Sequence, residues 1–171
     1  TTLLKMVNRI HELTEGELLY FGQDIMKLEA NEYRRKIGYV IQQGGLFPHK
    51  TVEDNIAVVP KLLKWDKQKI AQRTKELMQL VQLDYEKYRK RYPRSLSGGE
   101  QQRVGIARAL ATNPSIMLMD EPFGAIDAIT RGVLQKEIKR LQKQLGNTIL
   151  FVTHDVYEAF LLGQKIIVMD H

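Results

Sequence analysis

The run Ile116-Met117-Leu118-Met119 constrains the fold more than any other part of the chain. It is short and does not alternate with polar residues, which is typical of a strand buried on both faces of a parallel sheet. Segments with apolar residues at helical spacing come before and after it. Because parallel strands need long crossover connections, usually helices, the sequence predicts an α/β fold with a mostly parallel sheet.

The other elements are expected from the same periodicities. We predict further strands at 17–21, 37–41, 148–153 and 165–169, and helices at 2–12, 52–64, 66–82, from 97, from 133 to 145 and at 155–162. Gly146-Asn147 is expected to end the helix before the strand at 148–153.

Composition excludes several classes of protein. The chain has no cysteine, which excludes disulfides and thiolate metal sites. No apolar stretch approaches the roughly 20 residues of a transmembrane helix, and no signal-peptide pattern opens the chain. The net charge of +6 comes largely from 61–94, where solvated helix faces explain it more simply than a patch for nucleic acid or anionic lipid.

The acidic pair Asp120-Glu121 directly follows the buried run. The carboxyl edge of a parallel sheet is where α/β proteins bind ligands. In a site that handles phosphate groups, Asp120 could hold Mg²⁺, and Glu121 could orient or deprotonate an attacking water. A solvated turn continuing into Pro122 and Gly124 fits the same residues equally well.

The turn Ser97-Gly98-Gly99-Glu100 opens a predicted helix. Serine followed three residues later by glutamate is a capping box, which any helix can use. Two glycines in a first turn need a further reason, because glycine costs about 1 kcal/mol relative to alanine inside a helix. Close approach of backbone N–H groups to an anion supplies one.

Two more polar residues follow predicted strands, Gln42 and His154. Taken singly, each is explained as a loop glutamine or a structural histidine. A doubly wound sheet, however, brings strand ends together along one edge, and the chemistries of these residues and of Asp120-Glu121 suit a single magnesium-bound nucleotide.

The segment Leu96-Ser97-Gly98-Gly99-Glu100-Gln101-Gln102-Arg103-Val104 resembles the signature motif of ABC ATPases. Further segments resemble the family's other motifs in the family's order, namely a Q-loop (Tyr39-Val40-Ile41-Gln42-Gln43), a Walker B strand (116–121), a D-loop (Gly124-Ala125-Ile126-Asp127) and a switch histidine (Thr153-His154-Asp155). The resemblance covers essentially the whole chain. It implies a P-loop NTPase (RecA-like) core in 1–45 and 112–171, and a helical ABC subdomain in 46–111.

The resemblance also implies roles. Glu121, His154 and Gln42 would be catalytic, and Mg²⁺ would be held by Asp120, Gln42 and Thr1. ATP would be contacted by Thr1, Thr2, Ser97, Gly98, Gly99, Glu100 and Asp127. The signature residues would bind the γ-phosphate of ATP held by a second, identical subunit.

Within the family, Phe47-Pro48-His49 and the segment Asp120-Glu121-Pro122-Phe123-Gly124-Ala125 resemble importer ATPases. The segments 5–9 and 88–93 are most similar to the group that imports glycine betaine, carnitine or choline. The implied partners are transmembrane permease subunits and, indirectly, an extracellular or periplasmic solute-binding protein, and the implied location is the cytoplasmic face of the membrane. No nucleic-acid partner is expected.

One family element is not found in the sequence, the glycine-rich loop ending in Gly-Lys-Ser/Thr that cradles phosphates. The chain starts at Thr1-Thr2-Leu3-Leu4-Lys5, which is similar to the residues just after that lysine. We therefore expect a fragment truncated at its N-terminus, or a protein with unseen ends. The 171 residues alone are expected to bind ATP weakly or not at all, and to pair or exchange elements with another copy.

Three alternatives stay open at this point. The chain could belong to another class of importer, or to an ABC ATPase that acts on nucleic acid, which its basic charge suggests. The compact spacing from Gln42 to Ser97 argues against the second. The fragment could also serve only as a protein-binding module that docks membrane subunits through 43–95.

Overall fold

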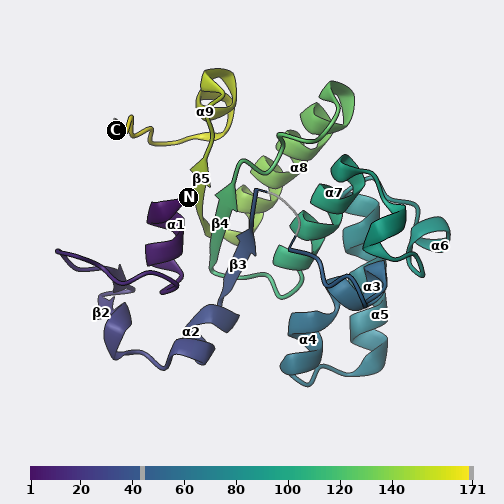
Figure 1. The fold of residues 1–171 in the computed structure, drawn as a ribbon, viewed down its shortest axis with the longest axis horizontal. Helices are drawn as coiled ribbons and strands as arrows, with labels where there is room; N and C mark the ends of the chain where they lie inside the picture. Colours follow the sequence, from purple (N-terminus) through teal and green to yellow (C-terminus); the bar gives the residue numbers. More distant parts are fainter. Residues whose placement is uncertain (43–44, 170–171) are drawn as a thin grey trace.

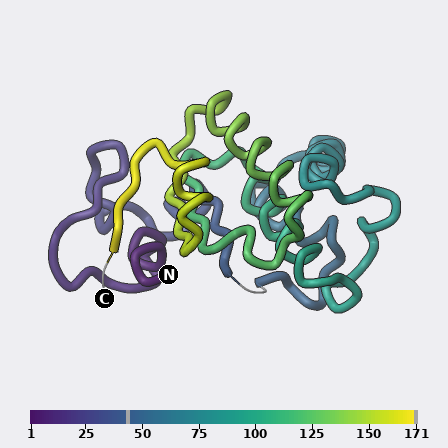
Figure 2. Tube along the Cα trace, turned by 90° about the horizontal axis from the view of Figure 1, so that it is seen from above, coloured from purple at the N-terminus to yellow at the C-terminus, as the bar shows by residue number. Residues whose placement is uncertain are grey.

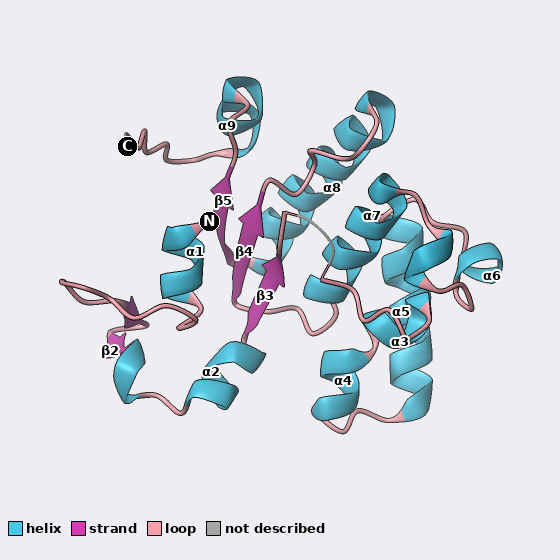
Figure 3. Ribbon diagram, viewed as in Figure 1, coloured by secondary structure: helices cyan, strands magenta, loops and turns pink. Residues whose placement is uncertain are grey.

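The computed structural model describes residues 1–42 and 45–169. Within these ranges the main sheet has three strands in the order β3 (Ile37–Val40), β4 (Ile116–Asp120) and β5 (Thr148–Val152) (Figure 1). Both pairings are parallel, so the carboxyl ends of all three strands lie at one edge of the sheet (Figure 3). The predicted α/β fold with a parallel sheet is confirmed.

Helices make both crossover connections. Between β3 and β4 lie α3 (Val52–Ile56), α4 (Val58–Leu62), α5 (Lys67–Leu80), α6 (Tyr85–Tyr88), the 3₁₀ turn Pro93–Ser95 and α7 (Gly98–Ala109). The helix α8 (Ala128–Leu145) joins β4 to β5, and α9 (Val156–Leu162) follows β5. Figure 2 shows α3 to α6 at the end of the molecule opposite α1 (Thr2–Val7) and α2 (Ala30–Arg35).

The helix boundaries follow from local hydrogen bonding. The Asp66 side chain accepts the N–H of Lys69 at the start of α5, and the Asp127 side chain accepts the N–H of Thr130 at the start of α8. The helix α8 ends at Gly146, whose φ of 62° lies in the left-handed region, so the predicted stop there is confirmed.

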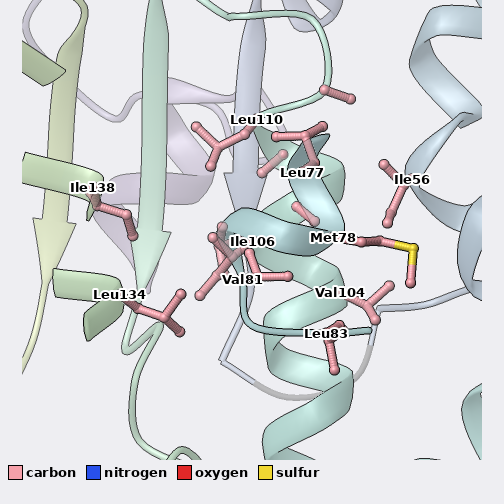
Figure 4. Close-up of a cluster of buried hydrophobic side chains, with 14 of the residues drawn as sticks. Ile56, Leu77, Met78, Val81, Leu83, Val104, Ile106, Leu110, Leu134 and Ile138 are labelled. Atoms are coloured by element: carbon pink, nitrogen blue, oxygen red, sulfur yellow. The ribbon is translucent and has the colours of Figure 1, made fainter. Parts of the chain in front are cut away.

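The hydrophobic core lies between the sheet and the helices α5, α7 and α8. Figure 4 shows Leu77 and Met78 of α5, Ile106 of α7 and Leu134 and Ile138 of α8 gathered in one cluster. The central residues of β4 are completely covered, because Met117, Leu118 and Met119 all have 0% of their surface exposed. Burial on both faces explains why this strand does not alternate.

Several expected elements differ from the structure. The helix predicted at 52–64 is two helices, α3 and α4, and the helix predicted at 133–145 begins at Ala128. The first helix ends at Val7, because Arg9 adopts a φ of 54°, which a right-handed helix cannot continue. The expected strand at 17–21 is a small hairpin of β1 (Leu19–Tyr20) and β2 (Gln23–Asp24). Residues 165–169 form no strand, since no neighbouring strand within the described residues offers them ladder hydrogen bonds.

Gly38 lies in β3 where α7 ends. A methyl group added at this position would meet the Ala109 carbonyl oxygen, and would lie 2.5 Å from Met117 Sδ and 2.9 Å from Pro114 Cγ. Only a residue without a side chain lets the helix end approach the strand this closely.

We therefore expect Gly38→Ala to lower the free energy of unfolding by about 1–3 kcal/mol, because backbone and core atoms must move apart. The midpoint of urea unfolding would measure it. The matched control is Gly132→Ala in α8, where an added methyl group meets nothing within 4 Å. That variant should be stabilised by up to about 1 kcal/mol. Equal effects of both substitutions would contradict the packing argument.

Among the helices of residues 1–42 and 45–169, none combines the length and the apolar character needed to cross a membrane.

Candidate active site

The acidic pair lies at the carboxyl edge of β4. Asp120 is the last residue of the strand and is buried, with 3% of its surface exposed. The backbone N–H of Glu121 donates to the Val152 carbonyl at 2.9 Å, so the pairing with β5 continues one residue beyond the strand. Glu121 itself has a φ of 45°, a left-handed conformation that costs an L-residue roughly 1–2 kcal/mol. The chain leaves β4 through a strained turn that contains this carboxylate.

Gln42 and His154 both contact the Glu121 carboxylate. The Gln42 side-chain amide donates to Glu121 Oε2 at 2.7 Å, and His154 Nδ1 lies 3.0 Å from Glu121 Oε1. The hydrogen bond with His154, and then the one from Gln42, lowers the pKa of Glu121, and the same carboxylate raises the pKa of His154. The structure thus brings together the three residues that the sequence suggested for catalysis.

Thr1 lies beside the other carboxylate of the pair. Its backbone nitrogen is 3.7 Å from Asp120 Oδ1, and it precedes α1, which starts at Thr2. Across residues 1–42 and 45–169, no three His, Cys, Asp or Glu side chains gather in a way that could hold a metal. Mg²⁺ commonly uses one or two carboxylates and completes its shell with water and substrate phosphates. Gln43 of the same loop as Gln42 lies outside the described residues.

The turn at the start of α7 is a capping box, as predicted. The Ser97 N–H donates to Glu100 Oε2 at 2.7 Å, and Ser97 Oγ accepts the Glu100 N–H at 3.3 Å. The Tyr88 hydroxyl donates to the other oxygen, Glu100 Oε1, at 2.7 Å. This hydrogen bond could not be predicted from the sequence, because nothing in the local pattern around Tyr88 indicates a partner on α7.

The two glycines of this turn have different surroundings. A methyl group at Gly99 would lie 2.8 Å from the Ala125 carbonyl oxygen, whereas one at Gly98 would lie 3.9 Å from Ala125 Cβ, an ordinary contact. Packing against the turn after β4 therefore explains Gly99 without a ligand. It does not explain Gly98, for which close approach of an anion remains the reason that we propose.

Asp127 caps α8 and is exposed. Hydrogen bonds from the backbone and then the side chain of Thr130 lower the pKa of Asp127. In the part of the chain that the structure describes, no hydrogen bond or ion pair joins Asp127 or Ser97 to Glu121. The candidate residues thus form two groups, one around Glu121 and one where α7 and α8 begin.

The motifs occupy the ends of elements in an order that a known family shares. The sequence pattern that describes the family "ABC transporter" matches residues 1–124, most of the chain. The chain belongs to the ABC transporter family.

Solved ABC cassettes have the same fold. A dimeric structure of the ATP-binding cassette MJ0796 in a post-hydrolysis state, bound to ADP and Pi, superposes with a TM-score of 0.85 at 35% identity. The superposition covers 94% of this chain and 72% of that one. The α/β P-loop NTPase fold expected from the ABC motifs is confirmed.

The sequence is also similar to named ABC subunits. The glycine betaine/carnitine/choline transport ATP-binding protein OpuCA of Bacillus subtilis is 54% identical over 99% of this chain and 44% of its own length. The carnitine transport ATP-binding protein OpuCA of Listeria monocytogenes is 55% identical over 99% of this chain and 42% of its own length. The glycine betaine uptake system ATP-binding protein YehX of Escherichia coli is 52% identical over 100% of this chain and 55% of its own length. The chain thus spans about half the length of these ABC relatives.

Proposed function

We propose that this chain carries the ATP-hydrolysing site of an ABC importer subunit. The observation that supports it most directly is the convergence of Gln42 and His154 on the Glu121 carboxylate at the carboxyl edge of the sheet. Such an arrangement is suited to phosphoryl transfer to water, where positioning and electrostatics do most of the catalytic work.

Each residue of this group has a distinct role in the proposal. Glu121 orients and polarises the attacking water, and its lowered pKa keeps the carboxylate ionised for that purpose. His154 donates a hydrogen bond toward the charge that develops on the transferred group. Gln42 would contact the metal or the water, and Asp120 with the Thr1 hydroxyl would hold Mg²⁺. When bound, the metal neutralises charge on the phosphate oxygens.

The second group of residues serves a second copy of the chain. Ser97, Gly98, Glu100 and Asp127 are exposed or partly exposed at the starts of α7 and α8. We propose that this surface closes on ATP bound to the other subunit. A phosphate group of that ATP would be the anion that approaches the backbone at Gly98. The dimeric state of the solved cassette supports the arrangement.

The remaining partners follow from the importer assignment. The helices of 46–111 would form the helical subdomain, which shares one hydrophobic cluster with the core in 1–45 and 112–171. We propose that the protein docks on transmembrane permease subunits at the cytoplasmic face of the membrane, and that a solute-binding protein acts on the outer side. Nucleic acid is not among the proposed partners.

The proposed solutes are quaternary-amine osmoprotectants. Relatives named for glycine betaine, carnitine or choline are 52–55% identical to this chain, and one named for osmoprotectant import is 50% identical. Relatives named for spermidine/putrescine import are 43–44% identical. Spermidine/putrescine import therefore remains the weaker candidate. In either case the solute would not touch this subunit.

Uptake by cells tests the solute class. The full-length protein would be expressed with its permease and solute-binding protein in cells that lack their own osmoprotectant uptake. We expect saturable accumulation of radiolabelled glycine betaine, carnitine or choline, and none of spermidine. Cells without the permease provide the control. Accumulation of spermidine alone would transfer the assignment to the polyamine class.

A further inference from the structure

Glu158 is a buried carboxylate that the proposed chemistry does not use. It lies in α9, four residues after His154, and 5% of its surface is exposed. No lysine or arginine nitrogen lies within 4 Å of it among residues 1–42 and 45–169. Burying a carboxylate without a cation is unfavourable unless hydrogen bonds compensate it, so its retention needs a reason.

Both oxygens of this carboxylate accept hydrogen bonds from neutral side chains. Gln135 Nε2 donates to Glu158 Oε1 at 3.1 Å, and Thr153 Oγ1 donates to Glu158 Oε2 at 2.9 Å. Gln135 belongs to α8 and is also buried, with 5% exposed. Through these two hydrogen bonds, Glu158 connects α8 to the loop after β5.

The loop that carries His154 is held on both sides by the same network. Thr153 Oγ1 accepts the N–H of Asp155 at 3.0 Å, and Asp155 Oδ1 accepts the N–H of Tyr157 at 2.8 Å and that of Glu158 at 3.3 Å. The residues before and after His154 are thereby fixed to one another and to α9.

The His154 side chain has little other support. It is 79% exposed, so packing does not fix its direction, and its hydrogen bond within the described residues goes to Glu121 at 3.0 Å. A cavity of about 220 Å³ lies beside it, lined by Glu121, Arg131, Thr153 and Glu158 among others. Whether the imidazole reaches Glu121 therefore depends on where the backbone of its loop places it.

We propose that Glu158 is a positioning residue, which holds the His154 loop through Thr153 and anchors it to α8 through Gln135, so that the imidazole reaches Glu121. The inference rests on the proposed ATPase function for its catalytic consequence, but the geometric part stands on the hydrogen bonds alone.

The kinetic test uses the full-length protein in its transport complex. We expect Glu158→Ala to lower kcat for Mg-ATP at least about tenfold with KM changed less than about twofold, because a misplaced group acts on the transition state. Glu158→Gln should recover most of the activity, since its amide can accept from Gln135 and donate to the Thr153 hydroxyl. The control is Glu137→Ala in α8, which removes a surface carboxylate paired with Arg140 and should change neither constant.

A double-mutant cycle of Glu158→Ala with His154→Ala separates a positioning role of Glu158 from a general loss of structure. Adding Glu158→Ala to His154→Ala should lower kcat by less than about twofold, because the residue through which it acts is gone. A further tenfold loss in that background would overturn the proposal. If Glu158→Ala does not fold, Thr153→Val decides the matter, because it keeps the volume and removes only the hydroxyl. Wild-type kcat in Thr153→Val would also overturn the proposal.

A readout other than activity keeps the two proposals distinguishable. If the wild-type complex hydrolyses no ATP, the ATPase proposal fails, and the positioning role is still measured by nuclear magnetic resonance of the His154 ring. The carboxylates of Glu121, Asp155 and Glu158 raise the pKa of His154. Thr153→Val changes no charge, so a fall in the pKa of His154 reports loss of the Glu121 contact. An unchanged pKa of His154 would refute the geometric part.

Discussion

Replacing Glu121 with glutamine is expected to lower the rate of ATP hydrolysis by about 10²–10³-fold while ATP binding is retained. The amide has nearly the same shape as the carboxylate, and it can still accept from Gln42 and pair with His154. It cannot take a proton or polarise water as a carboxylate does. The measurement is phosphate release by the full-length complex, compared with nucleotide binding under the same conditions.

The control for this substitution is Glu137→Gln, which alters a partly exposed carboxylate on α8 away from the sheet edge. It should leave hydrolysis and binding unchanged. A Glu121→Gln protein that hydrolyses ATP at the normal rate would remove the central residue from the proposed mechanism. Loss of binding together with hydrolysis would instead indicate that the turn after β4 had collapsed.

The second large effect is expected from Phe123→Ala, which should lower the free energy of unfolding by about 3–5 kcal/mol. Phe123 is fully buried two residues after Glu121, and its ring centre lies 5.8 Å from that of Phe151 on β5. Truncation leaves a cavity between the turn and the sheet. The shift in the midpoint of urea unfolding would measure the loss.

Ile129→Ala is the matched control, because Ile129 is 85% exposed at the start of α8. Its substitution should change the free energy of unfolding by less than about 0.5 kcal/mol. Similar losses in both variants would show that the core described around Phe123 does not support the sheet.

The elements that could be predicted from the sequence are those whose signals are local. The strand β4 was predicted because four consecutive apolar residues need burial on both faces, and the end of α8 because Gly146 favours a left-handed turn. The convergence of Gln42, Glu121 and His154 followed from a general rule, that parallel strands present their carboxyl ends at one edge.

What could not be predicted depends on partners distant in the sequence. No local sequence pattern indicates that Tyr88 bonds to Glu100 or that Glu158 bonds to Gln135. The apolar residues at 165–169 have the composition of a strand, but a strand forms only where a neighbour supplies ladder hydrogen bonds. Composition alone therefore predicts a strand at 165–169 that the sheet does not contain.

The contact of Gly99 with the Ala125 carbonyl has a consequence for assembly. It packs the first turn of α7 against the loop that leads into α8, so Ser97 and Asp127 are carried by two segments of one chain that already touch. A surface that is ordered before docking loses little conformational entropy when a second molecule arrives. If two copies pair as proposed, a substitution at Ala125 that widened this contact would weaken the proposed dimer without removing any of the proposed nucleotide-binding residues.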